Sequence, residues 1–312
     1  MMLARVADSL YWMGRYVERA EHVARLADVM LNATLDHSDA AVQTARIVLS
    51  AVGDSDMSRA GLVFDAARSL TLDRDDPNSV LISLARAREN ARQVRDQITT
   101  ETWERLNLLY LRVTGENAGL TFEAGSSAFL HDVIADLHLF KGAADATMSH
   151  GEGWRFLMLG MHLERARLVS RLLEVCFGDG RAINERITLM NLLRMACALE
   201  PYLRRYTSEI EPRHILDYLL FDEEFPRSIR FATARIEEHL VGISRHVESG
   251  GLSAPERLAG RLKARLQYAD VLELEATGAS DLLATVVNEC GRIHEAIFET
   301  FVAYSLEARL PA

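Results

Sequence analysis

Two glutamate-arginine dipeptides are the residues of this sequence whose types and spacing could do chemistry. Glu18-Arg19 and Glu164-Arg165 lie 146 residues apart, and both stand in the pattern G-x-x-x-E-R-A-x-x-x-x-R-L. A glutamate with a shifted pKa can act as a general acid or base. An arginine can hold a carboxylate or a phosphate through paired hydrogen bonds. The dipeptides are therefore candidates for acid–base catalysis and for anion binding.

The position of each arginine on its predicted helix is unusual. On a wheel of roughly 100° per residue, Arg19 falls among apolar residues that include Trp12 and Leu26, and Arg165 is placed in the same way. Glu18 falls on a polar face with Gly14. A guanidinium cannot lose its charge, so an arginine in an apolar sector must be paired or must bind an anion. Two interpretations stay open: a packing pair, or a cleft between two parts of the fold in which arginines hold an anion.

The repeat extends beyond the dipeptides and predicts two homologous halves. LDRDDPNSV (72–80) matches FDEEFPRSI (221–229), and residues 104–106 match 256–258. The offset between the matches grows along the chain, as expected for two copies that differ by small loop insertions. We expect a first helical half of residues 1–150 and a second of residues 151–312, packed as one body.

The pattern of the whole chain predicts an all-α fold, a helical bundle. No segment alternates apolar and polar residues with the β-branched enrichment of a strand, and no proline precedes Pro77. Helices are predicted at 3–33, 38–53, 59–70, 80–113, 126–149, 152–177, 183–207, 212–220, 226–248, 254–276 and 280–309. The fourth is expected to break near Thr99, and residues 114–125 are expected to form a loop.

A second candidate region follows residue 85. Glu89 could be a third acid–base group, while Arg92 and Arg95 share a basic helix face that Trp103 could cover. This face could bind an acidic ligand, or it could be a solvated surface joined by ion pairs.

A third candidate region joins the halves. His150 and Glu152 lie at a predicted helix N-terminus, where they could bind an anion or form an acid–base pair. A glycine turn that caps the helix is the alternative interpretation.

Composition and missing motifs exclude several classes of protein. The formal net charge of −10 disfavours nucleic-acid binding. No P-loop, dinucleotide-binding glycine motif, nucleophile elbow or H-E-x-x-H occurs, so neither a cofactor nor a metal is expected. The histidines and aspartates of residues 131–138 are spaced as metal ligands can be, but His131 and His138 lie off the helix face that holds Asp132 and Asp136, which disfavours a metal site there. The sequence shows no secretory signal and no membrane span, and its three cysteines are expected to be buried free thiols, which favours a cytoplasmic location.

The sequence resembles the bacterial alpha-E domain family. The resemblance rests on residues 3–26, 85–107, 151–166 and 222–229 and covers essentially the whole chain. The residues that match the family pattern are Trp12, Gly14, Arg15, Glu18, Arg19, Glu89, Arg92, Arg95, Trp103, Glu104, Gly153, Trp154, Glu164 and Arg165. The resemblance adds Arg15 to the candidate anion-binding residues.

The resemblance implies partners rather than a reaction. Members of the family are typically encoded beside, or fused to, a circularly permuted ATP-grasp protein, often with a transglutaminase-like peptidase. We therefore expect a helical partner of an ATP-grasp amide ligase, which binds that enzyme or its acidic, peptide-like substrate in a cleft between the two halves. The alternative is an all-helical enzyme of the same pathway, with Glu18, Glu164 and Glu89 as acid–base groups. The oligomeric state does not follow from the sequence.

Overall fold

The structure, a computed structural model, describes residues 2–35, 38–178, 183–207, 209–244, 251–272, 274 and 278–303. All secondary structure in these ranges is helical and no strand occurs in them, so the predicted all-α fold is confirmed. The α-helices are α1 (Ala4–Asn32), α2 (Ser38–Val52), α3 (Val63–Leu72), α4 (Val80–Gln93), α5 (Thr100–Thr114), α6 (Ala118–Ala124), α7 (Ser126–Thr147), α8 (Glu152–Phe177), α9 (Arg186–Met195), α10 (Leu199–Tyr206), α11 (Pro212–Phe221), α12 (Ile229–Ser244), α13 (Ala254–Gln267) and α15 (Ser280–Ile297). Two short 3₁₀ turns, η1 (Ala33–Leu35) and η2 (Met57–Gly61), and a π turn, η3 (Phe298–Val302), complete them.

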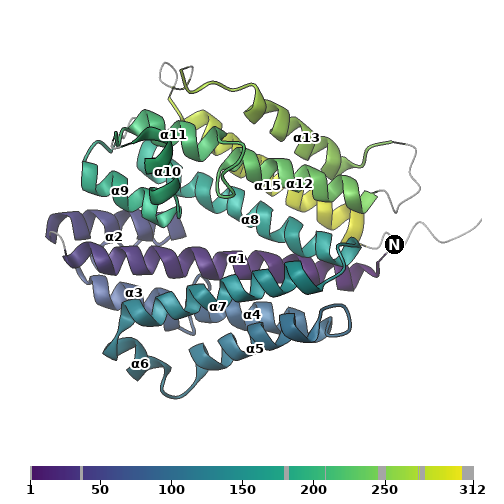
Figure 1. Ribbon diagram of the computed structural model, residues 1–312, viewed down its shortest axis with the longest axis horizontal. Coiled ribbons are helices and arrows are strands. Elements are labelled where there is room, and N and C mark those ends of the chain that lie inside the picture. Colours follow the sequence, from purple (N-terminus) through teal and green to yellow (C-terminus); the bar gives the residue numbers. More distant parts are fainter. Residues whose placement is uncertain are drawn as a thin grey trace, which may run out of the picture.

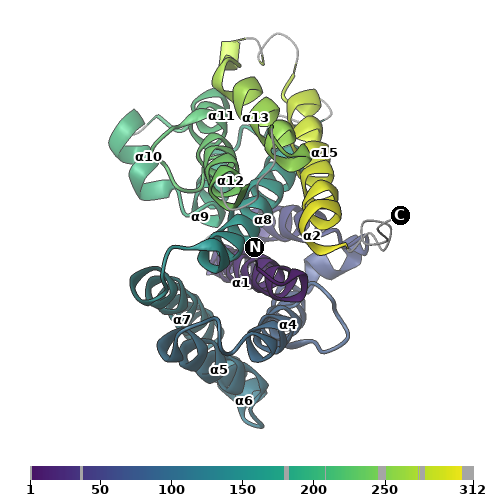
Figure 2. The same cartoon turned by 90° about the vertical axis from the view of Figure 1, so that its right-hand side faces the viewer.

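Two long helices, α1 and α8, cross at the centre of the molecule. Helices α4 and α7 pack against α1, and α5 packs against both of them. In a matching arrangement, α12 and α15 pack against α8, and α13 packs against both. Figure 1 shows α4 to α7 on one side of the crossing and α10 to α15 on the other, and the view in Figure 2 agrees.

The crossing is close because each helix presents a glycine to the other. A Cβ added to Gly14 would collide with the carbonyl oxygen of Leu157, and one added to Gly160 would collide with that of Tyr11. A glycine within a helix costs about 1 kcal/mol relative to alanine. Here it lets the backbones touch, so that the side chains beside each glycine reach the opposite helix.

Two equivalent turns start the helices that cover α1 and α8. Ser79 donates a hydrogen bond to the carbonyl oxygen of Asp73 (2.7 Å) and accepts one from the backbone of Ile82 at the start of α4. Ser228 does the same, with Asp222 (2.5 Å) and the backbone of Phe231 at the start of α12. Because a serine hydroxyl satisfies a free N–H of the first helical turn, each helix begins directly after its serine.

Several predicted boundaries need correction. The break near Thr99 is present, because its side chain accepts a hydrogen bond from Thr102 at the start of α5. The predicted loop 114–125 was wrong in part, since α6 occupies most of it. The predicted helix 183–207 is two helices, and Cys197 between them has a φ of 55°, which breaks the regular helical backbone.

Other outcomes concern the C-terminal third and the cysteines. The predicted helix 226–248 begins at Ile229 and is described to Ser244; residues 245–250 lie outside the described part. Helix α13 ends at Gln267, before the predicted end at residue 276. Residues 275–276 and 304–309, which were also predicted to be helical, lie outside the described part of the chain. Cys176 and Cys290 are buried free thiols as predicted, whereas Cys197 is only partly buried.

Candidate functional site

The Glu-Arg dipeptides pair with each other across the α1–α8 crossing. Glu18 on α1 accepts two hydrogen bonds from Arg165 on α8, from Nε at 2.7 Å and from Nη2 at 2.8 Å. In return, Glu164 on α8 accepts from Nε of Arg19 at 2.8 Å. The glutamate of each dipeptide therefore binds the arginine of the other. This geometry answers the question of what holds the two apolar-sector arginines.

Glu164 is the centre of a second set of contacts. Its Oε2 accepts from Nε of Arg15 at 2.7 Å, and its Oε1 accepts from Arg19 and from Nη2 of Arg167 at 2.9 Å. We call this set the Glu164 cluster: Arg15, Arg19, Glu164 and Arg167. Arg167 was not among the predicted residues, although it stands two positions after the second dipeptide.

Glu18 lies in a larger ionic network, which we call the Glu18 cluster. Its members are Glu18, Glu21, Arg25, His138, Lys141, Arg165 and Arg227. Lys141 on α7 binds Glu18 at 2.6 Å and also binds Glu21, which in turn is bound by Arg227. The sequence analysis missed Glu21, Lys141 and Arg227. One signal was available, since Lys141 is one of only two lysines in the chain.

The depth of the glutamates contradicts the helical-wheel expectation. Glu18 was expected on a polar face, yet it is 1% exposed, and Glu164 is 0% exposed. Arg19, expected to be the embedded residue, keeps 14% of its side chain exposed. The polar face of α1 is covered by α7 and α8, and a wheel drawn for one helix cannot show this. The pairs lie inside the crossing of α1 and α8 and do not line an open cleft.

The electrostatics hold both glutamates ionised. Burial alone would raise the pKa of Glu164, but the charges of Arg15, Arg19 and Arg167 lower it to about 2. Burial is likewise outweighed at Glu18, where Arg165 and Lys141 bring the pKa well below its usual range. A general acid must carry a proton near neutral pH. Neither carboxyl group has the shift that this role requires.

The predicted residues near Glu89 form a separate, exposed group. Glu89 accepts from Nε and Nη2 of Arg92 at 2.9 and 2.7 Å, which lowers the pKa of its exposed carboxyl group to about 2. Arg95 lies over the ring of Trp103 at 5.5 Å, and Arg88 lies over the same ring at 5.6 Å. The exposed Glu89–Arg92 pair is consistent with the solvated-face interpretation.

His150 and Glu152 are not joined by a hydrogen bond. His150 is half-exposed, hydrogen-bonds the carbonyl oxygen of Asp145 at 2.8 Å and stacks on Trp154 at 3.8 Å. Glu152 accepts from the backbone nitrogen of Met2 at 2.9 and 3.0 Å. His150 thus contacts the end of α7 and the start of α8, whereas Glu152 holds the backbone of Met2. Gly151 precedes the first residue of α8, in line with the glycine-turn interpretation.

The histidines of α7 bind carboxylates of α1 and do not pair with those of their own helix. His131 hydrogen-bonds Asp28 at 3.0 Å, and His138 hydrogen-bonds Glu21 at 3.1 Å. Among the described residues, no group of three or more His, Cys, Asp or Glu side chains is arranged to hold a metal ion. No helix of the described part has the length and apolar character needed to cross a membrane.

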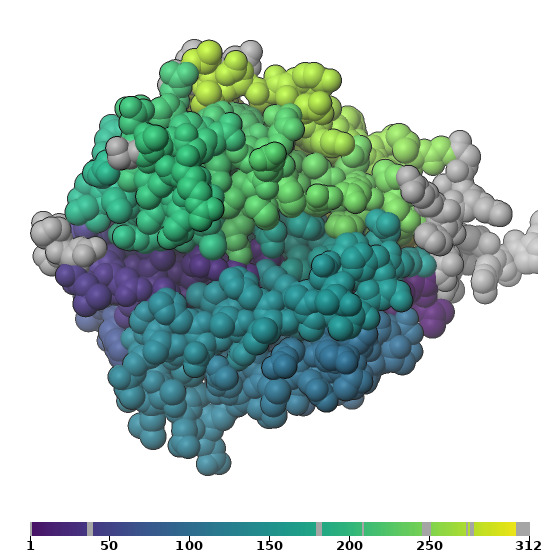
Figure 3. Space-filling model, in the orientation of Figure 1, coloured from purple at the N-terminus to yellow at the C-terminus, as the bar shows by residue number. Residues whose placement is uncertain are grey.

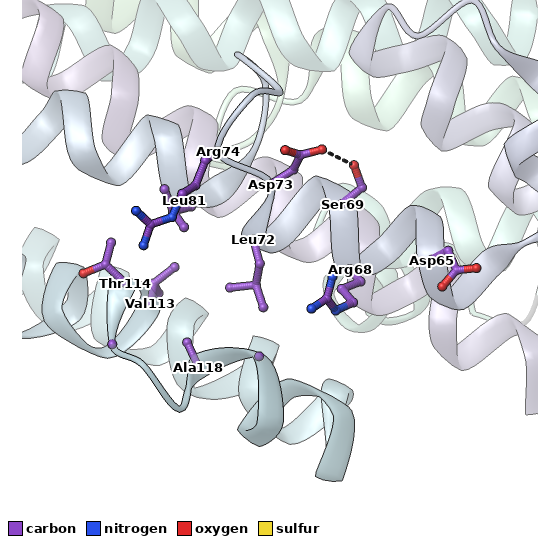
Figure 4. Close-up of a pocket in the computed structure, with 12 residues that line it drawn as sticks. Asp65, Arg68, Ser69, Leu72, Asp73, Arg74, Leu81, Val113, Thr114 and Ala118 are labelled. Atoms are coloured by element: carbon purple, nitrogen blue, oxygen red, sulfur yellow. Dashed lines mark hydrogen bonds between the residues drawn. The ribbon is translucent and has the colours of Figure 1, made fainter.

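The described surface also contains pockets away from the two clusters. One of about 470 Å³ lies between α3, α5 and α6, with Arg68 and Arg74 on its wall and Leu72 and Val113 on its apolar side (Figure 4). Others of about 670 and 590 Å³ lie beside Asp222 and beside Arg235. None of the predicted site residues lines these pockets.

Comparison with known proteins identifies the family. A family model described as a predicted alpha-helical domain with a conserved ER motif matches residues 2–302. An uncharacterised protein of Mycobacterium bovis and one of Mycobacterium tuberculosis are each 27% identical over 316 residues. The match covers 94% of this chain but only 35% of each relative, so the chain spans about a third of their length. No solved structure matches. Since the family model covers nearly the whole chain, this protein belongs to the Alpha-E family.

Proposed function

We propose that this chain is the helical partner of an ATP-grasp amide ligase, and that it binds the ligase together with an acidic, peptide-like substrate. The observation that carries the proposal is the length of the relatives. The segment similar to this chain fills 35% of each mycobacterial protein. In those proteins an alpha-E segment is thus covalently joined to about twice its own length of other sequence. A segment that occurs inside a longer chain is suited to work as an accessory beside a catalytic domain.

The state of the motif glutamates supports an accessory role over an independent catalytic one. Glu18 and Glu164 are buried, ionised and bound by arginines on another helix. Such groups neither release nor take up a proton near pH 7. The enzyme hypothesis with these residues as acid–base groups receives no specific support from their geometry.

The proposal includes an origin by internal duplication. Two pairs of contacts are reciprocal: Gly14 and Gly160 each meet the opposite backbone, and Glu18 and Glu164 each bind the opposite arginine. A third pair is equivalent without being in contact, since Ser79 and Ser228 make the same hydrogen bonds at the starts of α4 and α12. A pseudo-twofold arrangement of this kind is expected when two copies of one ancestral unit pack as a dimer would. The halves 1–150 and 151–312 would then be the two copies.

The test uses the purified chain and the ATP-grasp protein encoded beside it. We expect co-elution in size-exclusion chromatography, and a rate of ADP release that changes when the chain is added to the ligase with a panel of amines and acids. An unrelated acidic helical protein at the same concentration is the control. Separate elution together with an unchanged rate of ADP release would refute the proposal.

A further inference from the structure

The two clusters at the crossing differ in how their cations are satisfied. In the Glu18 cluster, two carboxylates offer four oxygens to four cations: Arg25, Lys141, Arg165 and Arg227. Arg165 is fully engaged, because its Nη1 also donates to the carbonyl oxygen of Pro226 at 3.0 Å. In the Glu164 cluster, the two oxygens of one carboxylate face three guanidiniums. The second cluster is therefore short of acceptors.

Two buried hydrogen-bond donors without a partner also indicate that the Glu164 cluster has too few acceptors. Nη1 of Arg15 and Nε of Arg167 are buried and make no hydrogen bond to the described residues, although the Tyr11 hydroxyl also interacts with the Arg15 guanidinium. Arg15 as a whole is 6% exposed. Among the arginines of the Glu18 cluster, only Nε of Arg25 is buried without a hydrogen-bond acceptor in the described part of the chain. A buried guanidinium without an acceptor is costly, and an anion brought to it is correspondingly stabilised.

The Glu164 cluster can also be reached from solvent. Arg19 and Arg167 bind the same oxygen of Glu164, and the side chain of Arg167 is 38% exposed. Arg19 and the exposed Arg86 of α4 both lie over the ring of Tyr16, at 5.4 and 5.7 Å. Three arginines from α1, α4 and α8 thus gather at one partly exposed edge.

Flat aromatic surface lies next to these arginines. Trp12 stacks on Tyr16 at 5.3 Å, and the guanidinium of Arg15 lies 4.7 Å from the Trp12 ring. Both rings are only partly buried. An edge that combines arginine forks with aromatic faces suits a carboxylate or phosphate carried on a larger group.

We propose that the Glu164 cluster is an anion-binding site, in which Arg19 and Arg167 hold a carboxylate or phosphate group with Arg86 at its entrance. Arg15 adds positive charge from the buried side. The Glu18 cluster is the structural counterpart of this site. The inference deepens the proposed function by assigning its acidic substrate to one face of the crossing, and it rests on that function only for the identity of the natural ligand.

The test needs no ligase, so its failure is distinct from failure of the proposed function. The chain has three tryptophans, and ¹⁵N-labelled protein should show one indole signal for each of them. We would titrate sodium phosphate and, separately, sodium acetate at constant ionic strength, with the Trp12 signal assigned through Trp12→Phe. A saturable shift of the Trp12 signal is expected, while Trp103 and Trp154 serve as internal references.

Two arginines of α8 provide a matched pair of variants. Arg167 and Arg171 are one turn apart, and each binds a glutamate three positions away, but Arg171 binds the surface residue Glu174. Arg167→Gln should weaken binding by about tenfold, the loss expected for one charge-assisted hydrogen bond. Arg171→Gln should leave binding unchanged. If Arg167→Gln does not fold, Arg86→Gln on the exposed edge replaces it and should also weaken binding.

Each outcome decides the proposal. A response to phosphate alone assigns a phosphate ligand, and an equal or stronger response to acetate assigns a carboxylate; both support the site. The proposal is overturned if the Trp12 signal does not saturate with either anion, if the Trp103 signal moves instead, or if Arg171→Gln weakens binding as much as Arg167→Gln. Loss of binding in Lys141→Gln, with Arg167→Gln unaffected, would move the anion to the Glu18 cluster and also overturn it.

Discussion

Glu18 of α1 and Arg165 of α8 form a two-point hydrogen-bonded ion pair, at 2.7 and 2.8 Å, inside the crossing of the two longest helices. Figure 3 shows α1 as a narrow purple strip between the teal surface of α7 and the green surface of the later helices. Lys141 of α7 and the carbonyl oxygen of Pro226, which precedes α12, also bind this pair, so its loss should destabilise the packing of several helices.

Removing the charge of Glu18 should be strongly destabilising. Glu18→Gln leaves Arg165 with a buried charge that only weaker dipoles can satisfy, and breaking such a pair costs about 3–5 kcal/mol. The free energy of unfolding from urea titration measures this cost. Glu89→Gln removes an exposed pair with Arg92 and is the control, which should leave the unfolding midpoint unchanged. The double variant Glu18→Leu with Arg165→Met should recover much of the loss; a double variant as unstable as Glu18→Gln would contradict this account.

The glycines at the crossing should not tolerate a methyl group. In Gly14→Ala the new Cβ meets the carbonyl oxygen of Leu157, so α1 and α8 must move apart and both clusters lose their geometry. The melting temperature should fall sharply in Gly14→Ala and in Gly160→Ala. Gly142, exposed within α7 and with no atom near its added Cβ, is the matched control. Gly142→Ala should raise stability by roughly 0.5–1 kcal/mol, and equal behaviour of the three variants would show that the crossing is not tightly packed.

The two turn serines should make similar contributions. Ser79→Ala and Ser228→Ala each remove the acceptor for the first turn of a helix, and such changes cost about 1 kcal/mol. Urea unfolding of the two variants gives the comparison, with Ser149→Ala in the exposed α7–α8 connection as the control. If only one of the two variants loses stability, the two equivalent turns contribute unequally to the free energy of unfolding.

Acid should destabilise the protein in two stages. Burial lowers the pKa of His22 and of His239 to about 4, so their neutral forms favour the folded state above the unfolded pKa near 6.5. This contribution is lost as the pH falls from about 6.5 to 4. The pKa of Glu164, lowered to about 2 in the folded state, adds a second loss as the pH falls from 4.5 towards 2.

Urea midpoints measured across this pH range test both stages. His239→Gln should flatten the first stage and leave the second in place. Stability that stays constant from pH 7 to pH 4 would contradict the buried, neutral state of the two histidines.

Much of the secondary structure could be predicted from residues that are close together in the sequence. The spacing of apolar residues located most of the helices, because helix formation depends on neighbours three and four residues apart. The requirement that Arg19 and Arg165 be paired or bind an anion also followed from the sequence, because a guanidinium keeps its charge wherever it is placed. The misplaced boundaries fell at Cys197 and in residues 114–125, where packing selects the backbone and propensity alone does not.

The partners of those charges were decided by the tertiary structure alone. The sequence shows two Glu-Arg dipeptides, but only the contact of Gly14 and Gly160 with the opposite backbones makes each glutamate bind the other dipeptide's arginine. The same crossing buries the face of α1 that looks polar on a wheel and brings Lys141 and Arg227 to Glu18 and Glu21 from more than a hundred residues away. Burial and electrostatic pairing depend on neighbours in space, and the cations that bind Glu18, which are Arg165, Lys141 and Arg227, are all distant from it in the sequence.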